Sequence, residues 1–270
     1  MASTKTATQA ARPAASSGGT AVARVGLVAR GVIYLLIGWV ALMLATGRTN
    51  QEADQRGALQ TLAGQPAGGA MLWALAIGFA AYALWRFSEA IRGVHGEGRK
   101  AGPRVTSAFR GFVYAFFALT TLSVLHGSRS SQASSQQDAT ARVMQHSGGR
   151  WAIGILGACV LIVGLGLAIG GLRRTFAKKL NTAQMSERTR HTVLILGAIG
   201  TTARGIVFAL AGGLVIQAAR NYDPAKARGL DEALRTLRDQ QYGAALLGLM
   251  ALGLITFGLY GLCEARWRRV

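Results

Sequence analysis

The sequence predicts an all-α polytopic membrane protein, with six transmembrane helices arranged as three parallel-repeat helical hairpins. Three observations support this class: 51% of the residues are hydrophobic and only 15% are charged, the apolar residues form six long blocks, and short motifs recur three times in register. A helix rising roughly 1.5 Å per residue needs about 20 residues to cross about 30 Å of hydrocarbon. The blocks that reach or approach this length are 25–46, 70–91, 108–126, 151–172, 192–218 and 243–264.

The proline and glycine positions agree with membrane helices. All four prolines lie outside these blocks or at their edges: Pro13, Pro66, Pro103 and Pro224. The 36 glycines instead cluster inside the blocks, where membrane helices use small residues for close packing. In the fourth block, Gly166 and Gly170 form a GxxxG step that predicts such a packing face.

The motif ARGVIY at 29–34 returns as FRGFVY at 109–114 and ARGIVF at 203–208. A glycine follows each arginine of these motifs by 38, 39 and 39 residues, at Gly68, Gly149 and Gly243. Each unit contains two crossings, so successive units keep the same orientation in the bilayer. A pseudo-threefold arrangement about the membrane normal is one hypothesis, and a row of hairpins fits the same repeat.

These repeats divide the chain into seven parts. We expect a flexible cytoplasmic tail at 1–24, hairpin repeats at 25–92, 107–173 and 192–266, cytoplasmic linkers at 93–106 and 174–191, and a basic C-terminus at 267–270. In the outer connections, the apolar spacing predicts short amphipathic helices at 58–64 and 230–240. The polar connection at 127–140 predicts a flexible loop, and only 141–145 resembles the same helix.

Charge predicts the orientation of the spans. Ten of the 30 Lys and Arg fall on the side of the outer connections together with seven of the 11 acids, so 20 basic residues and four acids fall on the other side. The positive-inside rule then places both termini in the cytoplasm of a multi-pass inner-membrane protein. A basic rim attracts anionic lipid headgroups, whereas no base-reading motif suggests nucleic acid. Protein partners are left open.

The repeated arginines lie at the cytoplasmic ends of odd-numbered spans, where a long side chain reaches the phosphate level. Glu89 and Glu264 end the returning helices at the same depth, so ion pairs Arg30 to Glu89 and Arg204 to Glu264 would hold each hairpin. Arg110 lacks this partner, because Gly170 stands where the other copies carry Glu. It would bind lipid phosphate or the carboxylate of a neighbouring copy. A ligand or substrate role for these five residues is the alternative.

No Asp, Glu, Lys, Arg or His lies midway along the six blocks, so no proton or ion pathway is evident. Thr120 and Thr121 are among the few polar residues there, and helix packing explains them as well as a pore lining. We expect no catalytic, cofactor-binding or metal-binding residue. The sequence therefore favours a structural or accessory inner-membrane protein. The alternatives are a channel or small-solute or lipid transporter with a pathway between the hairpins, and an enzyme acting on lipids at the Arg/Glu level.

The three Arg-Gly motifs with their returning helices resemble a bacterial integral-membrane family that is known only as a domain of unknown function. The resemblance covers about residues 25–266 and rests on three copies in register. It implies three tandem two-helix repeats and brings no activity. The absence of an acid at Gly170 argues against full equivalence of the three hairpins.

Overall fold

A computed structural model describes residues 17–93, 101–128 and 130–268. The α-helices in these ranges are α1 (Ser17–Ala45), α2 (Gln55–Ala63), α3 (Gly68–Arg92), α4 (Ala101–Leu125), α5 (Gln132–Met144), α6 (Gly149–Leu172), α7 (Glu187–Asn221), α8 (Leu230–Arg238) and α9 (Gly243–Trp267). Three short 3-10 helices accompany them: η1 (Thr175–Lys179), η2 (Thr182–Gln184) and η3 (Pro224–Ala227). Within these ranges, α1, α3, α4, α6, α7 and α9 are long and apolar enough to cross a membrane, which confirms the six predicted spans.

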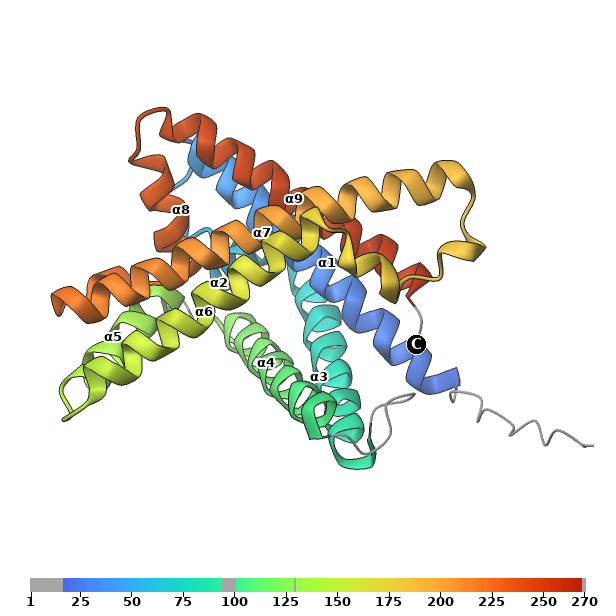
Figure 1. Cartoon of the computed structure of the whole chain (residues 1–270), viewed down its shortest axis with the longest axis horizontal. Coiled ribbons are helices and arrows are strands. Elements are labelled where there is room, and N and C mark those ends of the chain that lie inside the picture. The colour runs from blue at the N-terminus through green and yellow to red at the C-terminus, as the bar shows by residue number, and fades with distance from the viewer. Residues whose placement is uncertain (1–16, 94–100, 129, 269–270) are drawn as a thin grey trace, which may run out of the picture.

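The short helices α2, α5 and α8 connect the two spans of each repeat and lie toward the same end of the molecule, on the left of Figure 1. Helices at α2 and α8 were predicted. The prediction of a flexible loop at 127–140 was wrong, since α5 occupies most of this segment. Ser131 caps α5 by accepting a hydrogen bond from the Ser134 amide at 2.8 Å, and the Glu52 carboxylate accepts one from the Gln132 amide at 3.1 Å. Contacts distant in sequence thus fix a helix in a polar segment.

Helix ends on the side opposite α2, α5 and α8 also differ from the predictions. Helix α1 begins at Ser17, inside the segment 1–24 that was predicted to be a flexible tail, and Ala23 of this segment is buried in the core. The predicted linkers at 93–106 and 174–191 contribute the start of α4 and, in the second, η1, η2 and the start of α7. Residues 1–16 of the tail, 94–100 of the first linker and the last two residues of the basic C-terminus lie outside the described ranges.

The closest helix packing occurs between repeats. The most extensive contacts join α3 to α4, α6 to α7 and α9 to α1 (Figure 1). Each pair therefore combines the returning helix of one repeat with the first helix of the next, and α9 closes the cycle on α1. A row of hairpins in chain order would leave α1 and α9 at opposite ends, so the contact between these two helices argues against such a row. Within repeats, α1 contacts α3 and α7 contacts α9 less extensively, whereas α4 and α6 of the second repeat have almost no contact with each other.

Small residues every seven positions let the paired helices approach closely. A Cβ atom added at Gly164 of α6 would lie 2.3 Å from the Ala209 nitrogen of α7, and one added at Gly31 of α1 would lie 2.9 Å from the Gly258 oxygen of α9. The glycines of α6 that meet α7 in this way are Gly157, Gly164 and Gly171. The predicted packing face at Gly166 is wrong for contacts within the chain, because a Cβ there would meet no atom within 4 Å.

Candidate functional site

The three Arg-Gly motifs bring arginines and aromatic rings together near the ends of the spans that lie away from α2, α5 and α8. One turn after each arginine stands an aromatic residue: Tyr34, Tyr114 and Phe208. Tyr34 of α1 contacts Phe257 of α9 edge to face, with ring centroids 4.7 Å apart, and Tyr114 of α4 contacts Tyr82 of α3 at 4.4 Å. Phe257 and Tyr82 occupy equivalent repeat positions, so two helix pairs form the same aromatic contact.

Arg30 forms an ion pair with Glu264, which is 4% exposed, across the α1/α9 interface. The same carboxylate accepts a second hydrogen bond from Arg268 Nη1 at 2.6 Å. The predicted pair between Arg30 and Glu89 is therefore wrong. Its premise was that helices pair within a hairpin, whereas α1 packs most extensively on the returning helix of the third repeat. The ion pair consequently joins the last helix of the chain to the first.

Glu89 has other partners. Its carboxylate accepts hydrogen bonds from Arg86 Nη1 at 2.7 Å and from the Ser107 hydroxyl at 3.2 Å. Ser107 belongs to α4, so Glu89 also connects a returning helix to the next repeat. Arg86 is 4% exposed, donates to the Tyr82 hydroxyl at 2.5 Å and lies 4.5 Å from the centroid of Trp85.

Arg204 is held by aromatic faces. Its guanidinium carbon lies 5.1 Å from the Tyr34 centroid and 4.9 Å from those of Phe208 and Phe257. The predicted pair with Glu264 is wrong, and within the described ranges no acid lies within ion-pair distance of Arg204. Because each first helix packs on the preceding repeat, the position equivalent to Glu264 for Arg204 is Gly170. The arginine that loses its acid to this glycine is therefore Arg204, where Arg110 was expected.

Arg110 is half-buried on α4, three residues after Ser107 and thus near the level of Glu89. Among the described side chains it forms no ion pair, and the positive charges that act on it are those of Arg86 and Arg268. Lys179 in η1 lies near Arg110 and Arg268. Burial lowers the pKa of its ammonium group, and the positive charges of Arg110 and Arg268 lower it further.

Arg86 and Ser107 were not singled out from the sequence, and Lys179 and Arg268 were predicted only as parts of basic segments that contact lipid headgroups. Two of them follow a readable rule, since Arg86 precedes Glu89 by three residues and Arg268 follows Glu264 by four, both typical of pairs on one helix face. The approach of Lys179 depends on tertiary structure and leaves no local signal.

A second cluster of charges joins the outer connections. Asp54 caps α2 by accepting a hydrogen bond from the Gly57 amide at 2.9 Å, and it is 2% exposed. Asp231 of α8 accepts from the Ala53 amide at 3.0 Å and from Arg235 Nε at 2.8 Å. Burial raises the pKa of Asp54 to about 7, and the nearby carboxylates Glu52 and Asp231 contribute to the increase.

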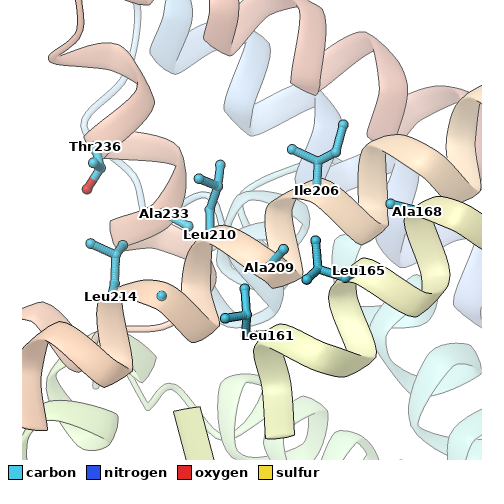
Figure 2. Close-up of a pocket in the computed structure, with 10 residues that line it drawn as sticks. Leu161, Leu165, Ala168, Ile206, Ala209, Leu210, Leu214, Ala233 and Thr236 are labelled. Carbon is cyan, nitrogen blue, oxygen red and sulfur yellow. The ribbon is translucent and has the colours of Figure 1, made fainter. Parts of the chain in front are cut away.

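A groove of about 460 Å³ lies between α6, α7 and α8. Figure 2 shows leucine, isoleucine and alanine side chains around it, and Thr236 as its polar residue. Since α6 and α7 are candidate spans, this groove offers a surface that suits a lipid acyl chain. Within the described ranges, no group of three or more His, Cys, Asp and Glu residues could hold a metal ion. The expected lack of catalytic and cofactor-binding residues stays a prediction.

Comparisons with known proteins agree with the repeat. The family model described as Domain of Unknown Function (DUF1206) matches three times, at residues 25–93, 105–174 and 199–268. The uncharacterized protein YxxB of Bacillus subtilis (strain 168) is 31% identical over 250 residues, which cover 92% of this chain and 90% of that protein. No solved structure matches the chain. With three tandem copies of the domain and six apolar helices, the chain belongs to the DUF1206 family of membrane proteins.

Proposed function

We propose that the protein is a non-enzymatic structural or accessory component of the bacterial inner membrane. The observation that carries this proposal is the extensive packing of three helix pairs between repeats, with α9 packed on α1 and joined to it by the ion pair between Arg30 and Glu264. The acids at this level, Glu89 and Glu264, are both bonded to arginines, and the aromatic rings pack on one another. Such contacts stabilise one arrangement of helices.

The hydroxyl groups inside the spans support packing over a pore. Thr121 is fully buried and donates to the Phe117 carbonyl at 2.7 Å, and Thr256 donates to the Leu252 carbonyl at 2.7 Å. Threonine hydroxyls that bond to their own helix satisfy themselves without a pathway of water or ions. Thr120, the other residue considered for a pore, is 7% exposed.

The proposal includes an orientation with both termini in the cytoplasm and the basic side facing anionic lipid headgroups. The support is the distribution of 20 basic residues on one side and ten on the other. We expect an impermeant maleimide to label Gln51→Cys in intact cells and Gln184→Cys only after permeabilisation. Both residues are exposed, and the background would carry Cys159→Ala and Cys263→Ala.

Labelling with the opposite side preference would contradict the orientation. The structural role has a separate test, since proteoliposomes containing the protein should release entrapped small solutes no faster than empty vesicles. A faster release that Arg204→Gln abolishes would establish a transport pathway and overturn the structural role.

A further inference from the structure

The segment around η1 places a lysine beside the end of α9. Leu180 forms an antiparallel bridge with Arg268, and the Asn181 amide donates to the Trp267 carbonyl at 2.8 Å. Phe176 anchors the other end of this segment, because it is 8% exposed and its ring lies 5.1 Å from that of Tyr260. Lys179 directly precedes the bridged Leu180, so its ammonium group is held near Arg268.

Helix α4 brings a further cation to this place. The hydrogen bond from Ser107 to Glu89 fixes the height of α4 against α3. One helical turn later, Gly111 lies directly against the Phe87 ring, where an added Cβ would be 2.7 Å from the nearest ring carbon. Arg110 is therefore held at the α3/α4 interface, and its positive charge acts on Lys179.

The charges at this place do not balance. Among the residues that the structure describes, two acids, Glu89 and Glu264, stand among five cations: Arg30, Arg86, Arg110, Lys179 and Arg268. Both carboxylates already accept two hydrogen bonds each. Three positive charges in excess, partly removed from water, repel one another unless an anion joins them.

We propose that Arg110, Lys179 and Arg268 bind one phosphate group, supplied by the headgroup of an anionic phospholipid. A phosphate suits this set, since arginine donates to it in a bidentate manner and lysine adds a point charge. The inference rests on the proposed function, because that orientation puts these residues at the level of the cytoplasmic headgroups. The exposed face of Lys179 gives the ligand access.

The test measures how lipids raise the melting temperature of the purified protein in detergent. The probes are dioctanoyl phosphatidylglycerol, dioctanoyl phosphatidylcholine and inorganic phosphate, compared on the native chain and on Arg110→Gln/Lys179→Gln. The matched control is Arg188→Gln/Arg190→Gln, which removes two exposed positive charges from the start of α7. If the first double variant does not fold, Lys179→Gln alone replaces it, because this side chain is exposed.

We expect phosphatidylglycerol, and not phosphatidylcholine, to stabilise the native chain and the control, with binding to Arg110→Gln/Lys179→Gln about tenfold weaker. Equal stabilisation by inorganic phosphate, lost in the same variant, would support the site with a free phosphate as its ligand. The site would be wrong if both lipids act equally, or if the double variant responds as the native chain does. Such a result would leave the orientation and the structural role intact, since labelling and solute release test those independently.

Discussion

At the scale of single residues, the equivalent arginines of two repeats have different partners. Arg30 and Arg204 occupy the same position of equivalent motifs, yet Arg30 forms an ion pair with Glu264, whereas Arg204 lies among three aromatic faces. The difference follows from one position of the preceding repeat, which is Glu264 in one case and Gly170 in the other. A guanidinium can exchange a carboxylate for aromatic rings because its flat, weakly hydrated cation stacks well on them.

Asp54 gives a prediction about pH. Its pKa is raised from 3.8 to about 7 in the folded protein, so the folded state binds more protons than the unfolded state between these values. The contribution of Asp54 to the free energy of unfolding should therefore be largest below about pH 4, and it should decrease as the pH rises toward and through 7. Asp54→Asn keeps an amide oxygen for the cap and removes the titration, so its melting temperature should depend less on pH between 5 and 8.

The control for this prediction is Asp239→Asn, which replaces an exposed acid at the end of α8. Its pH dependence should match that of the native chain. An unchanged pH dependence in Asp54→Asn would show that this carboxyl titrates alike in the folded and unfolded states.

At the scale of helices, the tightest interfaces are built from small residues seven positions apart. Gly157, Gly164 and Gly171 of α6 face α7, and in the cycle the equivalent faces are Ala251 and Gly258 of α9 against α1. Without a hydrophobic drive between helices in lipid, close backbone approach and the resulting dispersion contacts supply the stability.

The glycines of α6 provide a matched pair of substitutions. Gly164→Ala would force a Cβ to within 2.3 Å of the Ala209 backbone, so α6 and α7 must separate, at a cost of about 1–3 kcal/mol. Gly166→Ala adds the same methyl group where no atom lies within 4 Å, and it should be neutral or slightly stabilising. SDS titration in mixed micelles measures both. Equal destabilisation by the two variants would place the α6/α7 interface elsewhere.

Sequence patterns predicted most of the helices. Length and hydropathy identified six spans, and apolar spacing identified α2 and α8. Helix α5 was not predicted, because its polar sequence shows little helical periodicity and its N-terminus is held by Glu52 from another repeat. The prediction of a packing face from the GxxxG step at Gly166 was wrong for a related reason. A chain rich in glycine offers several small-residue faces, and only the fold selects one.

At the scale of the whole molecule, the repeat closes on itself. The sequence predicted three parallel units, but it did not state whether a first helix packs on its own returning helix or on that of the preceding unit. Glu89 and Glu264 occupy equivalent positions of their repeats, so the sequence alone offers both as partners of Arg30 at the same depth. The choice is made by long-range packing, in which α1 contacts α9 far more extensively than it contacts α3.

The measurement that tests this closure most directly is a pair of double-mutant cycles on the free energy of unfolding. We expect Arg30→Gln and Glu264→Gln to couple by about 1–3 kcal/mol, because each variant breaks the same buried ion pair. Arg30→Gln and Glu89→Gln should be additive within about 0.5 kcal/mol. Strong coupling of Arg30 to Glu89 with none to Glu264 would contradict the cycle and restore hairpins that pack within each repeat.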